Sequence, residues 1–65
     1  MKVRLNGEEK TIGSGNIYDL ITEIELDHSS VVVELNKKII KKENWRSTGI
    51  KKDDSIEILS FVGGG

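Results

Sequence analysis

The chain has 65 residues, enough for one small domain, and its ten basic and eleven acidic side chains leave a formal net charge of −1 at pH 7. It has no cysteine, so neither disulfide bonds nor a thiolate metal site can support the fold. The balanced charge argues against nucleic-acid binding, which depends on neutralising phosphates with lysine and arginine.

The first residues predict a β-hairpin. Residues 1–5 alternate apolar and polar side chains, which is typical of a half-buried strand. Asn6 and Gly7 follow, and this pair favours a type I′ turn because both central residues of such a turn need positive φ. Residues 8–12 predict the returning strand. Lys10 would share a face with the isoleucine at the end of this strand, a pattern that an edge strand tolerates.

An amphipathic helix is predicted next. Residues 13–15 interrupt the strand, and Asn16 is a good N-cap because its side-chain oxygen can accept a bond from an unpaired backbone N–H. Asp19 lies in the first turn, where the helix dipole favours an acidic side chain. The apolar stripe has helical spacing and consists of Ile17, Leu20, Ile21 and Ile24. It ends by Leu26, and a polar connection follows.

Three more strands are predicted in the second half of the chain. They occupy residues 31–35, 39–40 and 55–62, with turns at residues 36–38 and 53–54 and an irregular segment at 41–47. That segment contains Trp45, which as an exposed residue would be a partner anchor. In so small a domain we favour a core role, because one buried tryptophan removes about 150–250 Å² from water. Tyr18 lies off the helical stripe and is predicted to be partly exposed.

This order of elements predicts an α+β domain with the ubiquitin-like β-grasp arrangement. We expect a mixed sheet of four to five strands, with one main helix packed on one face. In the β-grasp fold the last strand lies in the middle of the sheet, parallel to the first. The predicted domain spans residues 1–62, and residues 63–65 form a flexible tail.

Side-chain catalysis has little support in the sequence. His28, beside Ser29 and Ser30, lacks the third group and the oxyanion hole that a Ser–His pair needs, so these are predicted to be solvated turn residues. Asp53 and Asp54 provide too few oxygens for calcium, and no phosphate-loop, dinucleotide or zinc motif is present. We therefore predict no catalytic residue, no metal and no bound cofactor.

No feature of the sequence suggests a membrane. No apolar run approaches the roughly 20 residues that a membrane-spanning helix requires. The N-terminus enters the alternating strand pattern directly, without a visible signal peptide. We expect a cytoplasmic protein.

The three glycines at 63–65 are the unusual feature of the chain. Glycine loses the most conformational freedom on ordering, so folding alone does not favour them. A cloning remnant is the alternative, but no linker or tag residue precedes them. Three residues extend at most about 10 Å, and without side chains they could enter a narrow channel of another protein. The reactive group would then be the carboxylate of Gly65, with Gly64 and Gly63 completing the reactive tail.

The last strand suggests a docking surface beside this tail. If Ile56 and Ile58 face the helix, Leu59 and Phe61 face solvent, because successive side chains alternate across a strand. Val32 is the expected neighbour. Grouped, exposed apolar side chains indicate a protein–protein contact. A bulge that buries Phe61 at the end of the sheet is the alternative.

These features resemble a known family. Over its whole length the chain is similar to the ThiS-type sulfur carriers of thiamine biosynthesis, which belong to the ubiquitin-like MoaD/ThiS superfamily. The similar segments are residues 5–7, 16–21, 33–37, 39–40, 43–45, 54–58 and 61–65. A C-terminal Gly-Gly is shared with ubiquitin, molybdopterin-synthase small subunits and tRNA-thiolation carriers, which are usually longer. The chain has one glycine, Gly63, beyond the two of the family pattern.

The resemblance implies that the chain is a protein cosubstrate in a sulfur relay and not an enzyme. An E1-like enzyme would use ATP and magnesium to adenylate the carboxylate of Gly65. Sulfur from a persulfide-bearing enzyme would displace AMP, leaving a thiocarboxylate that passes its sulfur to thiazole synthase. In the family pattern Gly64 and Gly65 are the reactive tail, and Leu59 and Phe61 map onto the strand that docks with partners.

Other functions remain open at this point. The same tail suits a sulfur carrier for molybdopterin synthesis or tRNA thiolation, and also a ubiquitin-like modifier joined to lysines through an amide. A third alternative is an interaction module whose glycine tail is incidental. Deleting Gly64 and Gly65 separates the interaction module from the carriers and the modifier, because only the interaction module would keep its binding.

Overall fold

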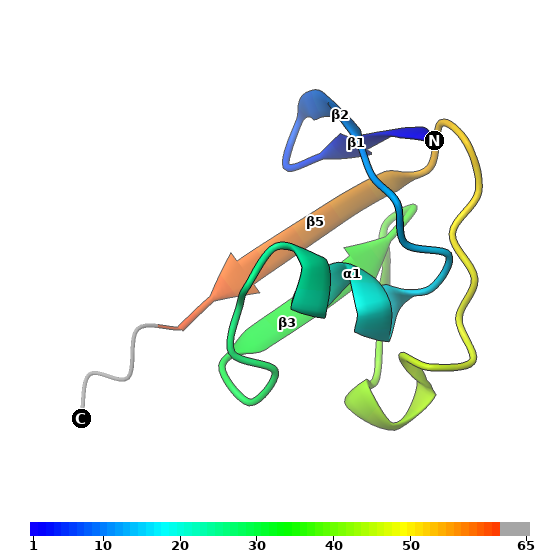
Figure 1. Ribbon diagram of the computed structural model, residues 1–65. Coiled ribbons are helices and arrows are strands. Elements are labelled where there is room, and N and C mark those ends of the chain that lie inside the picture. The colour runs from blue at the N-terminus through cyan, green and yellow to red at the C-terminus, as the bar shows by residue number, and fades with distance from the viewer. Residues whose placement is uncertain (62–65) are drawn as a thin grey trace.

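The computed structural model describes residues 1–61, which form five strands, one α-helix and one short 3₁₀ helix (Figure 1). In chain order the elements are β1 (Lys2–Leu5), β2 (Glu8–Thr11), α1 (Ile17–Glu23), β3 (Val31–Leu35), β4 (Lys38–Ile40), η1 (Lys42–Asn44) and β5 (Ser55–Ser60). Val62 and the predicted tail at 63–65 lie outside the described residues. The domain boundary after residue 62 therefore stays a prediction.

The strands form one mixed sheet in the order β2-β1-β5-β3-β4. β1 runs parallel to β5, with Arg4 opposite Ser55, and the other neighbouring pairs are antiparallel. β5 therefore lies in the centre, parallel to the first strand, as predicted. α1 packs on one face of the sheet (Figure 1). The predicted α+β architecture, a mixed sheet with one helix, is confirmed.

Both hairpin turns have the left-handed backbone that a type I′ turn needs. The φ angles are 51° at Asn6 and 82° at Gly7, and 51° at Asn36 and 71° at Lys37. Asn6 has a second role, because its Oδ1 accepts a 2.7 Å hydrogen bond from the backbone N–H of Ile58. The first turn is thereby anchored to the central strand.

β2 is an edge strand and all four of its residues are exposed. The predicted strand was one residue longer. The chain leaves β2 after Thr11, and Ile12 turns into the core with 3% exposure. Lys10 and Ile12 therefore do not share a face of one strand as the sequence pattern suggested, because Ile12 lies beyond the end of β2.

The start of α1 follows the prediction. The side-chain oxygen of Asn16 accepts a 2.8 Å bond from the backbone N–H of Asp19, as an N-cap does. The stripe residues Ile17, Leu20 and Ile21 are fully buried. The helix is held to the sheet by this apolar face.

α1 ends at Glu23, earlier than the predicted stripe. Glu25 adopts φ 59°. Its backbone N–H donates to the carbonyl of Thr22, and that of Leu26 donates to the carbonyl of Ile21. These two bonds form a Schellman motif, which terminates a helix by satisfying its last carbonyls. The motif here has glutamate where glycine is usual.

The core between α1 and the sheet is aliphatic apart from Trp45. Its buried members are Val3, Leu5, Ile12, Ile17, Leu20, Ile21, Val33, Trp45, Ile50, Ile56 and Ile58. Trp45 is 1% exposed, and its Nε1–H donates to the carbonyl of Ile40 at 2.9 Å. The core role predicted for Trp45 is confirmed, and its one polar atom is paired.

Candidate docking surface

The face of the sheet opposite α1, here called the open face, carries exposed apolar side chains at one end. On β5 the isoleucines at 56 and 58 are buried, so Glu57 and Leu59 point to the open face. Leu59 and Phe61 are each 59% exposed. Phe61 is therefore not buried by a bulge.

Val32 lies directly opposite Leu59 in the β3–β5 ladder. The backbone N–H of Phe61 donates to the carbonyl of Ser30 at 2.7 Å, so β5 stays hydrogen-bonded to the start of β3 beyond the last residue of the strand. We call Val32, Leu59 and Phe61 the apolar patch. The structure brings together these three predicted docking residues, and their docking role stays a prediction. The predicted reactive residues Gly63, Gly64 and Gly65 lie outside the described residues.

Ile39 is a residue of this face that the sequence analysis did not single out. It is 68% exposed and lies opposite Glu34 in the β3–β4 ladder. The sequence does indicate that either Ile39 or Ile40 is exposed, since of two adjacent strand residues only one can face the core. The sequence does not say which of the two isoleucines does so.

The next cross-strand pair on the open face consists of two glutamates and is here called the acidic rung. Glu34 on β3 lies directly opposite Glu57 on β5. The next rung toward the hairpin turn is polar, with Ser55 donating its backbone N–H to the side chain of Asn36 at 2.9 Å. The open face therefore changes from apolar to acidic to neutral polar along β5, moving away from the C-terminus.

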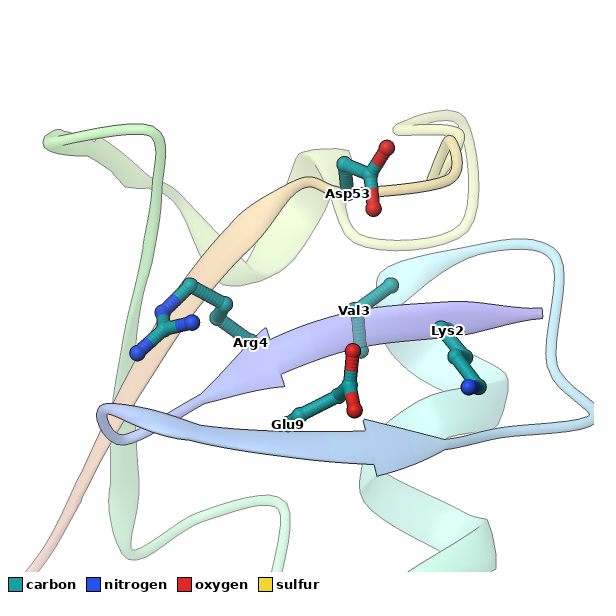
Figure 2. A pocket seen from close by; sticks show the side chains of 5 residues that line it. All are labelled: Lys2, Val3, Arg4, Glu9 and Asp53. Carbon is teal, nitrogen blue, oxygen red and sulfur yellow. The ribbon is translucent and has the colours of Figure 1, made fainter.

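A shallow pocket of about 100 Å³ lies near the β1–β2 hairpin, lined by Lys2, Val3, Arg4, Glu9 and Asp53 (Figure 2). The charged ends of its side chains diverge and do not converge on one point (Figure 2). The backbone N–H of Asp53 donates to the carbonyl of Lys2 at 2.8 Å, so the pocket lies where the turn before β5 contacts β1. We assign no ligand to it.

His28 differs from the prediction, because it is half-buried and packs on the helix. Its ring centroid lies 4.5 Å from that of Tyr18, and its Nε2 lies 3.0 Å from Oγ1 of Thr22. The serines beside it donate to the carboxylate of Asp27. These bonds, above all the one from the Ser29 hydroxyl, lower the pKa of Asp27. No Ser–His pair forms, and the arrangement stabilises the loop.

Tyr18 is partly exposed, as predicted, and borders a second shallow pocket that is also lined by Lys42, Glu43 and Arg46. The guanidinium carbon of Arg46 lies 3.7 Å from the centre of the tyrosine ring. This is a cation–π contact within the chain. The arginine is therefore already occupied by packing.

Glu23 also has a structural role. Its carboxylate accepts hydrogen bonds from the hydroxyl of Ser14 and the backbone N–H of Gly13. These bonds, the serine hydroxyl first, lower the pKa of Glu23 because they favour its charged form. The carboxylate thus ties the end of α1 to the loop before the helix.

Among residues 1–61 no three His, Cys, Asp or Glu side chains come together as metal ligands. In the same part of the chain no helix is both long and apolar enough to cross a membrane. The site features that the structure does provide are the apolar patch, Ile39 and the acidic rung.

A five-stranded mixed sheet of this order, with one helix on one face, defines a ubiquitin-like β-grasp protein. The crystal structure of thiamine biosynthesis protein ThiS from Geobacter metallireducens superimposes with a TM-score of 0.84 at 32% sequence identity, and the match covers 100% of both chains. The fold is therefore the β-grasp fold that the sequence predicted.

Sequence comparison leads to the same family. The ThiS family model matches residues 3–65. The sulfur carrier protein ThiS of Bacillus subtilis is 40% identical over an alignment of 65 positions, which covers 97% of this chain and 98% of that protein. A thiazole synthase of Paramagnetospirillum magneticum is 33% identical over an alignment of 66 positions, which covers 100% of this chain but 20% of that protein. The chain belongs to the ThiS family, as the sequence resemblance implied.

Proposed function

We propose that this chain is a sulfur carrier for thiazole formation in thiamine biosynthesis, and that its working group is the C-terminal carboxylate of Gly65. The observation that carries the proposal is the ThiS family match, which continues to the last glycine of the chain. The apolar patch, two strands wide and beside the C-terminal end of β5, supports it.

The chemistry needs an activated carboxylate. A free carboxylate is a poor electrophile, so an E1-like enzyme would use ATP and magnesium to convert it to an acyl adenylate and release pyrophosphate. A persulfide sulfur would then attack the acyl carbon and expel AMP. Reductive cleavage of the resulting S–S bond by a thiol would leave the thiocarboxylate. The chain acts as a protein cosubstrate in these steps and contributes no catalytic side chain.

The apolar patch would orient the tail in each partner. From Phe61, four further residues reach at most about 14 Å in a fully extended chain. A partner that covers the patch must therefore hold its reactive centre within that distance of Phe61. Glycines suit such a tail because they present no side chain to a narrow channel.

Three partners follow from the proposal. They are the E1-like adenylating enzyme, a persulfide-bearing sulfur donor and thiazole synthase, which receives the sulfur. The last is supported by the Paramagnetospirillum magneticum thiazole synthase, in which a segment similar to this whole chain makes up one fifth of the protein. Joining a carrier and its acceptor in one polypeptide would keep the two at a high effective concentration.

The test is intact-mass spectrometry after incubation with ATP, a thiamine-pathway adenylating enzyme and a persulfide source. We expect a mass shift equal to the exchange of one oxygen for sulfur. A variant lacking both Gly64 and Gly65 should show no shift. A variant lacking Gly65 alone still ends in Gly-Gly and is the matched control for reach, since it shortens the tail by about 3.5 Å.

The outcomes distinguish the functional classes. The shift followed by thiazole formation with thiazole synthase would establish the proposed pathway. The shift without sulfur transfer to thiazole synthase would indicate a carrier for another pathway. An absent shift, under conditions where the Bacillus subtilis ThiS reacts, would rule out the proposed thiamine-pathway carrier and leave a carrier for another pathway or an interaction module.

A further inference from the structure

The open face contains a charge arrangement that folding does not explain. Glu34 and Glu57 are direct cross-strand neighbours on β3 and β5. Side chains in such a pair have Cβ atoms about 4.5–5.5 Å apart, and like charges at this position destabilise a sheet. The arrangement therefore costs stability in the free protein.

The arginine on the neighbouring strand β1 does not neutralise the two negative charges. Arg4, on the neighbouring β1, directs its guanidinium to the carbonyl of Gly7 at 3.1 Å. In the part of the chain that the structure describes, no side-chain hydrogen bond to Glu34 or Glu57 offsets the repulsion. On the other side of the pair lies Ile39, opposite Glu34 on β4.

Apolar side chains border the two carboxylates. One rung along the strands, about 7 Å away, lie Leu59 and Val32. Ile39, which is 68% exposed, lies across the ladder from Glu34. A partner that covers these apolar side chains would also exclude water from the acidic pair. Two desolvated carboxylates require a cation, and charge complementarity at such a position selects the correct partner.

We propose that Glu34 and Glu57 together bind one arginine side chain of thiazole synthase, and that Ile39 extends the docking surface onto β4 beside that contact. This inference rests on the proposed function and names a specificity-determining contact of the same surface. A guanidinium has donors on several edges and can bond to two carboxylates at once, which an ammonium does with less geometric definition.

Thiazole synthase is favoured as the occupant because a segment similar to this chain occurs within one of these enzymes. The apolar patch at the C-terminal end of β5 and the acidic rung beyond it form one continuous strip along β5 and β3. A surface that covers this strip contacts the patch and the acidic pair together. The tail then enters the enzyme from the end of the same strip.

The inference is tested by titrating the full chain with the thiazole synthase of its own organism in isothermal calorimetry, at low and at high ionic strength. The variants are Glu34→Gln, Glu57→Gln, the double variant and Ile39→Ala. Glu8→Gln, on the exposed far edge of the sheet, is the matched control for a lost surface charge. Melting temperatures are measured for every variant.

We expect each glutamine variant to raise Kd about tenfold and to weaken the salt dependence of binding, while its melting temperature is unchanged or higher. The double variant should lose less than the sum of the two, because both carboxylates bind one group. Ile39→Ala should also raise Kd, and Glu8→Gln should leave Kd unchanged. A residue with only a structural role would not combine weaker binding with equal or greater stability.

Three results would overturn the inference. If the glutamine variants bind as the unmodified chain does, and the unmodified chain delivers sulfur for thiazole formation, the acidic pair has no part in docking and the proposed function survives. If the unmodified chain neither binds thiazole synthase nor acquires the thiocarboxylate, the proposed function and the inference fail together. Concentration-dependent sedimentation of the chain alone, abolished in Ile39→Ala, would show that the strip pairs two copies and would also overturn it.

Discussion

Phe61→Ala tests the docking surface most directly, because it removes the largest exposed side chain of the apolar patch. Phe61 is 59% exposed. An aromatic side chain buries about 150–250 Å² in full, so a partner could cover about 90–150 Å² of it. At about 25 cal/mol per Å², that area is worth about 2–4 kcal/mol of binding free energy. We therefore expect Kd for partner enzymes to rise on the order of 100-fold.

The effect of Phe61→Ala on stability should be smaller. The backbone N–H of Phe61, which donates to Ser30, is kept in the variant. The covered part of the ring is the lesser part, and burial measured against an extended chain overstates the gain on folding. We expect a loss of about 1 kcal/mol, which lowers the melting temperature of a domain this size by about 4–8 °C.

The assay is paired calorimetric titration and thermal unfolding of each variant. Tyr18→Ala is the control, since Tyr18 is a partly exposed aromatic residue on the helix and makes packing contacts with Arg46 and His28. It should lower the melting temperature and leave Kd unchanged. A strong fall in the melting temperature of Phe61→Ala, with a Kd equal to that of the unmodified chain, would show that Phe61 has a structural role and no docking role.

Three further predictions concern the fold that presents this surface. Asn6→Ala should cost about 2–4 kcal/mol in chemical unfolding, because it leaves the backbone N–H of Ile58 unpaired and places alanine at positive φ, whereas Asn6→Asp keeps an acceptor and should cost less. Trp45→Ala should cost about 3–5 kcal/mol, enough to leave much of so small a domain unfolded in far-ultraviolet circular dichroism. The pKa of Glu23 is lowered in the folded state, chiefly by the Ser14 hydroxyl, so its contribution is complete above the unfolded pKa of about 4.5 and is lost as pH falls through the folded value. Glu23→Gln should therefore reduce stability at neutral pH and flatten the acid limb of a melting-temperature profile, and an unchanged acid limb would contradict this assignment.

Much of the local structure could be predicted from the sequence because its causes are local. Asn6 and Gly7 determine a tight turn through their backbone preferences, and Asn16 caps a helix that begins at the next residue. The alternation in β5 predicted that Leu59 faces away from the core, as the structure confirms. The end of α1 was harder to predict, because the left-handed residue of its Schellman motif, Glu25, is not the usual glycine.

The amino-acid pattern is enough to predict the turns, the helix start, the inward and outward residues of the best-patterned strands, and the family to which the chain belongs. Three features are visible only in the folded chain: Glu34 lies opposite Glu57, Ile39 and not Ile40 faces solvent, and His28 packs on Tyr18. The physical reason is the range of the interactions. Alternation within a strand depends on adjacent residues, whereas register between β3 and β5 depends on a core assembled from distant parts of the chain.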